Sequence, residues 1–116
     1  MPFAYIKQGN NYKYLVDGKW QVSSSGKTIS INSPTDGSLV GGIQAITQKE
    51  IDLVLAGAKK AQEKWADLPV SKRAEILMNA ADLILKNKNI IAGFLVKEVD
   101  KPKTLSLNEI ERTADL

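Results

Sequence analysis

The sequence predicts an α/β fold in which an N-terminal β-hairpin and further short strands precede about four α-helices. Three observations support this prediction. The pair Asp17-Gly18, typical of a tight turn, separates Tyr14-Leu-Val16 from Lys19-Trp-Gln-Val22, which can return antiparallel. The capping box Thr47-Gln-Lys-Glu50 marks the point where the apolar period lengthens from two to about 3.6 residues. No strand-like segment alternates with the later helices, so these residues alone predict no βαβ unit.

The expected strands are bounded by residues that favour turns. Asp17-Gly18 suits the positive φ angles of a two-residue hairpin turn, and Pro34 presets φ in the turn that follows the third strand. Gly41-Gly42 is expected to interrupt the last strand. We therefore expect strands at residues 14–16, 19–22, 28–31 and 39–43.

The expected helices follow from apolar residues at spacings of three and four. The first begins at the capping box and places Trp65 in a core. Pro69 ends it and opens a second helix, for which the apolar face consists of Ile76, Leu77, Ala80, Leu83 and Ile84. Either Asn87 or Asn89 caps a third helix, and Pro102 fits the first turn of a fourth.

Composition excludes several classes of protein. The chain has no cysteine and no histidine, which excludes disulfides, thiolate metal sites and a cysteine nucleophile within these 116 residues. The net charge is +3, and the lysines are scattered among acidic residues, so we expect no nucleic-acid partner. No apolar run reaches the roughly 20 residues that a membrane-spanning helix needs, and the N-terminus lacks a signal-peptide pattern. We expect a cytoplasmic protein without a membrane partner.

Five short motifs occur along the chain in a distinctive order. They are Tyr14-Leu-Val-Asp-Gly-Lys-Trp20, Ser33-Pro-Thr-Asp-Gly37, Ala61-Gln-Glu-Lys-Trp65, Glu98-Val-Asp-Lys-Pro-Lys103 and Glu111-Arg-Thr-Ala-Asp-Leu116. The ordered set resembles the N-terminal segment of the aldehyde dehydrogenase superfamily. The nearest resemblance is to the branch of non-phosphorylating glyceraldehyde-3-phosphate, lactaldehyde and succinate-semialdehyde dehydrogenases. It implies that residues 1–116 form the outer, N-terminal part of a Rossmann-like cofactor-binding domain, with the catalytic domain absent from this chain.

The resemblance also implies an activity for the longer enzyme. Members of the family use NAD or NADP to oxidise an aldehyde to a carboxylate through a thioester on a catalytic cysteine. The catalytic groups then lie outside these residues, so we expect the chain alone to be inactive and assign it no catalytic or cofactor-binding residue. The implied substrate is an aldehyde, with glyceraldehyde 3-phosphate as a candidate, and the implied assembly is a homo-oligomer, a tetramer or a dimer.

Two other interpretations of the chain stay open. It is either a self-contained, non-enzymatic α/β interaction or structural module derived from that family, or a fragment cut from a longer enzyme. The particular aldehyde and the choice between NAD and NADP also stay open.

Arg112 is the candidate substrate-binding residue. It matches an arginine that, in the glyceraldehyde-3-phosphate branch, helps to hold the substrate phosphate. A guanidinium suits this task because it offers paired donors and a permanent charge. The alternative is an ion pair with Glu109 or Glu111 on the same helix.

Asp100, Ile31 and Asn32 are the candidate metal ligands. Asp100 falls at the expected C-terminal end of the third helix, where a carboxylate meets the negative end of the helix dipole. In several aldehyde dehydrogenases the matching position helps to bind a monovalent cation, together with backbone oxygens that correspond to Ile31 and Asn32. The alternative is that Lys101 or Lys103 compensates the negative charge of Asp100 at the helix end. Other charges without a partner at useful spacing are interpreted as solvated, namely Lys19, Lys72, Arg73, Glu75 and Glu98.

Overall fold

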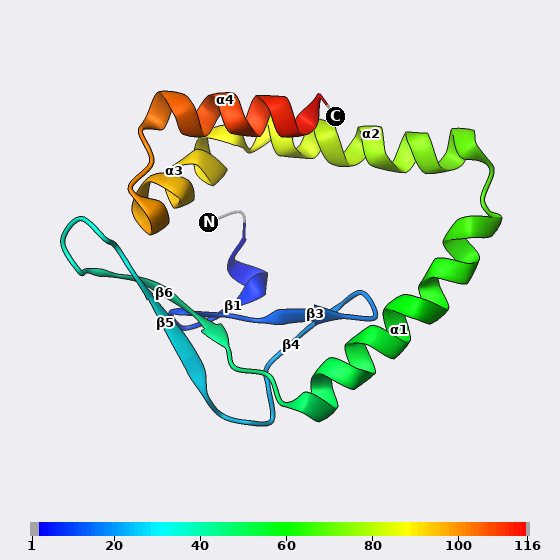
Figure 1. Cartoon of the computed structure of the whole chain (residues 1–116), viewed down its shortest axis with the longest axis horizontal. Helices are drawn as coiled ribbons and strands as arrows, with labels where there is room; N and C mark the ends of the chain where they lie inside the picture. Colours follow the sequence, from blue (N-terminus) through cyan, green and yellow to red (C-terminus); the bar gives the residue numbers. More distant parts are fainter. Residues whose placement is uncertain (1–2, 116) are drawn as a thin grey trace. The chain divides into compact units, whose positions relative to one another are not determined.

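A computed structural model describes residues 3–115 of the chain. The fold divides into two compact units, of which the first comprises residues 1–32 and 39–67 and the second residues 33–38 and 68–116. Figure 1 shows that strands and one long helix make up the first unit, whereas the second consists mainly of helices. The predicted order, with strands first and helices after them, is confirmed.

The first unit contains the short strands and one helix. Its elements are η1 (Ala4–Ile6), β1 (Lys7–Gln8), β2 (Asn11–Tyr12), β3 (Tyr14–Val16), β4 (Lys19–Gln21), β5 (Thr28–Asn32), β6 (Leu39–Gln44) and α1 (Gln48–Asp67). One sheet has the strand order β1-β2-β6-β5, with β2 parallel to β6 and the other pairs antiparallel. Strands β3 and β4 form a separate antiparallel hairpin.

The β3–β4 hairpin has the predicted tight turn. Asp17 and Gly18 have φ angles of 47° and 72°, which is the left-handed backbone that such a turn requires. The turn closely approaches α1, because a Cβ atom on Gly57 would lie 2.6 Å from Oδ1 of Asp17. A glycine in the middle of α1 therefore leaves room for the hairpin turn beside the helix.

The expected interruption of the last strand at Gly41-Gly42 is wrong. Strand β6 is continuous, and both glycines pair with β5. Their missing side chains leave space on β6, because a Cβ on Gly41 would lie 3.0 Å from the ring of Tyr12 and one on Gly42 would lie 2.2 Å from Oδ1 of Asn11. The glycines thus admit neighbouring side chains instead of breaking the strand.

The second unit contains α2 (Val70–Lys86), α3 (Lys88–Val99) and α4 (Lys103–Ala114). In Figure 1, α4 runs beside α2 in the opposite direction. Among residues 3–115, the only apolar side chains that are buried are Ala92 on α3 and Ile110 on α4. Ser106 of α4 is fully buried as well, and its Oγ donates to the carbonyl oxygen of Pro102 at 3.1 Å. The core of this unit therefore involves α3 and α4.

The predicted helix boundaries are largely confirmed, but one predicted cap is wrong. Pro69 and Pro102 stand immediately before α2 and α4. Asn87 precedes α3, yet its side chain does not cap that helix. Its amide nitrogen instead donates to the carbonyl oxygen of Leu83 at 2.8 Å, near the end of α2. Asn89 lies inside α3, so neither asparagine performs the expected capping.

Several large apolar side chains lie exposed on the described surface. The most exposed on the helices are Leu53, Leu55, Val70, Leu77, Met78 and Leu83. Trp65 is half-buried rather than enclosed in the expected core. No helix within residues 3–115 is both long enough and apolar enough to cross a membrane.

These exposed side chains lead to a prediction about the isolated chain. Because contiguous apolar surface favours association, the purified 116-residue protein should self-associate and should bind a hydrophobic dye. Light scattering after gel filtration and dye fluorescence measure these properties. A monomer with a sharp two-state melt and no dye binding would instead favour the self-contained module.

Candidate functional site

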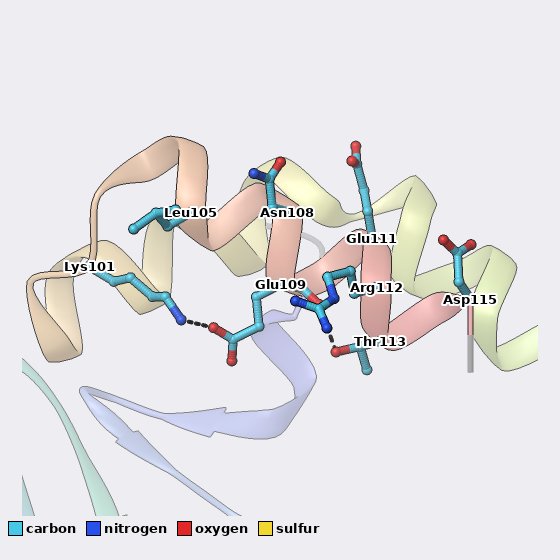
Figure 2. A pocket seen from close by; sticks show the side chains of 8 residues that line it. All are labelled: Lys101, Leu105, Asn108, Glu109, Glu111, Arg112, Thr113 and Asp115. Carbon is cyan, nitrogen blue, oxygen red and sulfur yellow. Dashed lines mark hydrogen bonds and ion pairs between the residues drawn. The ribbon is translucent and has the colours of Figure 1, made fainter.

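Arg112 lies on the exposed side of α4, in the last turn of the helix. It lines an open depression with a volume of about 790 Å³, formed by residues from α4 and from the segments at its two ends. Figure 2 shows the Arg112 side chain directed along the helix, whereas Glu111 and Asp115 project to another side. Arg112 therefore presents its guanidinium at the surface of the second unit.

The alternative role for Arg112, an ion pair on its own helix, is not observed. Glu111 instead pairs with Lys88 of α3, with 2.7 Å between Oε1 and Nζ. Glu109 pairs with Lys101, as the dashed line in Figure 2 marks. Within the part of the chain that the structure describes, both glutamates thus have lysine partners, and neither pairs with Arg112.

The three candidate cation ligands fall into different units. Ile31 and Asn32 lie at the end of β5 in the first unit, where the pairing with β6 shifts its register. Asp100 belongs to the second unit and ends α3 in a left-handed conformation, with φ 54° and ψ 32°. Its position at the helix end is as predicted. Lys101, one of the two residues expected to compensate Asp100, pairs with Glu109 instead.

Glu50, in the first turn of α1, is an ionisable group with several hydrogen bonds. Its Oε2 accepts from the backbone nitrogen and hydroxyl of Thr47 at 2.7 and 3.0 Å, and the hydroxyl of Thr47 accepts from the Glu50 nitrogen at 3.2 Å. The predicted capping box is confirmed. The hydroxyl of Ser23 and the backbone nitrogen of Ser24 also donate to the carboxylate, each at 2.7 Å. Glu50 therefore joins the loop after β4 to the start of α1.

These donors explain the titration of Glu50. Hydrogen bonds from the Thr47 and Ser24 backbone and from the Ser23 hydroxyl lower the pKa of Glu50 from 4.5 to about 2. The same negative charge acts on Tyr14, the pKa of which is raised by desolvation and then by Glu50. These donors come from the loop after β4 and from the start of α1, and they stabilise the ionised form of the carboxylate. We call this cluster the carboxylate junction, and its role is structural.

Sequence reasoning missed two parts of this arrangement. Ser23 and Ser24 lie more than twenty residues before Glu50, so no local pattern connects them. The interpretation of Arg73 as a solvated charge is wrong, because this residue is half-buried in α2. A helical projection gives a signal for it, since Arg73 precedes the apolar Leu77 by four residues and Ala80 by seven.

Comparisons with known proteins show which family this chain is similar to. A family model described as "Aldehyde dehydrogenase family" matches residues 20–116. The NADP-dependent glyceraldehyde-3-phosphate dehydrogenases of Triticum aestivum and Arabidopsis thaliana are 44% and 45% identical to the chain over 114 residues. Each alignment covers 98% of this chain and 23% of the relative, so the chain spans about a quarter of the length of these relatives.

A solved structure supports the same assignment. The chain resembles the NADP-dependent glyceraldehyde-3-phosphate dehydrogenase of Bacillus halodurans C-125, which was crystallised with NADP, with a TM-score of 0.88 and 39% sequence identity. The likeness covers 90% of this chain and 22% of that one. The predicted α/β fold is confirmed, and so is the resemblance read from the ordered motifs. The chain belongs to the aldehyde dehydrogenase family.

Proposed function

We propose that this chain acts as the N-terminal portion of an NADP-dependent enzyme that oxidises an aldehyde, with glyceraldehyde 3-phosphate as the favoured substrate. The observation that carries the proposal is its similarity, over nearly its whole length, to relatives named for that substrate and cofactor. The chain supplies an outer hairpin and flanking helices to the cofactor domain. Catalysis requires a cysteine, which these residues do not contain, so the chain alone is inactive.

Arg112 is the proposed contact with the substrate phosphate. Three features support this role: its exposure, its place in the depression along α4, and the engagement of both neighbouring glutamates by lysines. The guanidinium is therefore available to a bound anion. The lysine partners of Glu109 and Glu111 also offset two of the carboxylates that would oppose an anion there.

A fusion enzyme tests the proposed function. Residues 1–116 would replace the aligned N-terminal segment of the wheat relative, with which they share 44% identity. We expect the fusion to reduce NADP in the presence of glyceraldehyde 3-phosphate, because the catalytic cysteine comes from the wheat portion and the segment fits its domain. A folded fusion that oxidises no aldehyde would contradict the proposal.

A monovalent cation held by Asp100 and the backbone oxygens of Ile31 and Asn32 is part of the proposal. The resemblance of the ordered motifs to the family supports it, and Asp100 stands at the C-terminal end of α3 as expected. Hard oxygen ligands suit such an ion, and its charge would offset a carboxylate at the negative end of a helix.

This cation site predicts a salt effect on the fusion enzyme. Replacing a large organic cation in the buffer with sodium or potassium should raise its melting temperature, and Asp100→Ala should remove that increase. Scanning calorimetry at constant ionic strength measures the effect, with the exposed Asp67→Ala as the matched control. A melting temperature indifferent to both the ion and Asp100→Ala would rule the site out.

The proposed cellular location and oligomeric state follow from the resemblance to the family. We propose a cytoplasmic homo-oligomer, a tetramer or a dimer, in which residues outside this chain form the subunit contacts. Gel filtration of the fusion enzyme with light scattering measures its oligomeric state.

A further inference from the structure

Two carboxylates stand three residues away from Arg112 at the end of α4. Glu109 precedes it and Asp115 follows it, and side chains at that spacing can pair across one face of a helix. Figure 2 shows Asp115 projecting away from the Arg112 guanidinium. An acid that precedes the base is also the more favourable order for such a pair. Glu109 is therefore the natural internal partner of Arg112 and the group that would compete with a bound anion.

Lys101 holds Glu109 in a different ion pair. Its Nζ contacts a carboxylate oxygen of Glu109, and Figure 2 shows this carboxylate turned toward Lys101 and away from the Arg112 guanidinium. Lys101 lies just before Pro102, the residue that precedes α4, so the contact ties this segment to the side of the helix. Lys101, Glu109 and Arg112 all line the same open depression. The ion pair therefore keeps Glu109 from becoming the partner of Arg112.

The position of Arg112 on α4 makes a free guanidinium important there. The C-terminal end of a helix carries partial negative charge, which opposes a bound anion. Arg112 is the basic residue in the last turn of α4. A phosphate in this depression would thus depend on the guanidinium. If Glu109 were released from Lys101, its carboxylate would occupy the guanidinium and would also repel the phosphate.

We propose that Lys101 is a positioning residue for substrate selectivity. Its pair with Glu109 keeps the Arg112 guanidinium open to the phosphate of a phosphorylated aldehyde. The Lys101 and Glu109 side chains are 34% and 51% exposed, so their pair contributes little to stability and should act mainly on selectivity. Lys101 acts through Glu109 and does not itself contact the substrate. This inference rests on the proposed function, because that function supplies the phosphorylated substrate.

Four variants of the wheat fusion enzyme test this role. Lys101→Met removes the charge and keeps much of the side-chain length, whereas Lys101→Arg keeps the charge. Lys101→Met combined with Glu109→Gln removes both charges of the pair, so Glu109 can no longer compete for Arg112. Lys103→Met is the matched control, because Lys103 is exposed and does not line the depression.

Two measurements are made on each variant. Initial rates with glyceraldehyde 3-phosphate and with unphosphorylated glyceraldehyde give kcat and KM for both aldehydes. Titration calorimetry gives the Kd of 3-phosphoglycerate, which is the acid formed when the phosphorylated aldehyde is oxidised. The second measurement needs no turnover, so it also reports on a fusion without activity.

The expected result is a loss confined to the phosphorylated compounds. Lys101→Met should raise both KM for glyceraldehyde 3-phosphate and the Kd of 3-phosphoglycerate on the order of threefold to tenfold, because Glu109 then competes with the phosphate for Arg112. It should leave kcat unchanged, as well as KM for unphosphorylated glyceraldehyde. Lys101→Arg, Lys103→Met and the double variant should behave like the unmodified fusion.

Several outcomes would overturn the inference. A double variant as impaired as Lys101→Met would mean that Lys101 contacts the phosphate itself. Equal losses with both aldehydes would give Lys101 a purely structural role, and a Lys101→Met fusion without any change would make the ion pair irrelevant to selectivity. An unmodified fusion that binds no 3-phosphoglycerate would also refute it. A fusion that binds 3-phosphoglycerate in a Lys101-dependent way but oxidises no aldehyde would contradict only the proposed function.

Discussion

Replacing Glu50 with Gln should strongly destabilise the first unit of this chain. The ionised carboxylate accepts from Thr47, Ser23 and Ser24, and a neutral amide accepts more weakly and presents an unmatched donor in place of one oxygen. Both the cap of α1 and the attachment of the loop after β4 depend on this group. We expect loss of tertiary near-ultraviolet circular dichroism and a clearly lower urea midpoint.

The same substitution should remove a specific dependence on pH. A carboxyl group with a lowered pKa in the folded protein favours folding while it is ionised. For Glu50 that contribution is complete above its ordinary pKa of 4.5 and is lost as the pH falls towards about 2. The difference in urea midpoint between the wild type and Glu50→Gln should therefore shrink across this range.

Glu63→Gln provides the control for both effects, because Glu63 is an exposed glutamate on the same helix. It should leave the near-ultraviolet signal and the acid response of the wild type unchanged. A Glu50→Gln protein with the stability and pH profile of the Glu63→Gln protein would show that the carboxylate junction contributes nothing.

Replacing Arg112 with Ala in the fusion enzyme should change substrate selectivity. If the guanidinium holds the substrate phosphate, kcat/KM for glyceraldehyde 3-phosphate should fall on the order of tenfold to a hundredfold, as expected for the loss of a charged hydrogen bond. The value for unphosphorylated glyceraldehyde should change little. Initial rates of NADPH formation with the two aldehydes measure this ratio.

Lys103→Ala is the matched control for Arg112→Ala. Lys103 is an exposed cation on the same helix, but it does not line the depression that contains Arg112. Replacing Lys103 should not lower kcat/KM for either aldehyde, because it changes only the overall positive charge of α4. Equal losses for the phosphorylated and unphosphorylated aldehydes in Arg112→Ala would refute a phosphate contact.

Local signals in the sequence predicted most of the elements. Asp17-Gly18 forms the expected hairpin turn, Thr47 and Glu50 form the expected cap, and Pro69 and Pro102 stand immediately before helices. Each of these depends on residues close together in the chain. The interruption expected at Gly41-Gly42 was wrong because strand pairing with β5 and space for distant side chains outweighed the weak strand propensity of glycine.

The candidate sites were less predictable, because they depend on contacts between distant residues. No pattern in the sequence links Ser23 to Glu50 or Lys88 to Glu111. In the structure Glu111 pairs with Lys88 and not with Arg112. Arg73 was misinterpreted although its spacing from Leu77 and Ala80 places it near the apolar side of α2, where its Nε is shielded from solvent. The roles of Arg112 and of the cation ligands stay predictions that came from family resemblance.

The most direct test of the account is an activity assay on the purified 116-residue chain by itself. The chain contains no cysteine that could act as the nucleophile, so it should form no NADPH or NADH with glyceraldehyde 3-phosphate or any other aldehyde, at any protein concentration. The wheat fusion enzyme, assayed beside it, should form NADPH. Aldehyde-dependent reduction of NADP or NAD by the isolated chain would contradict the account.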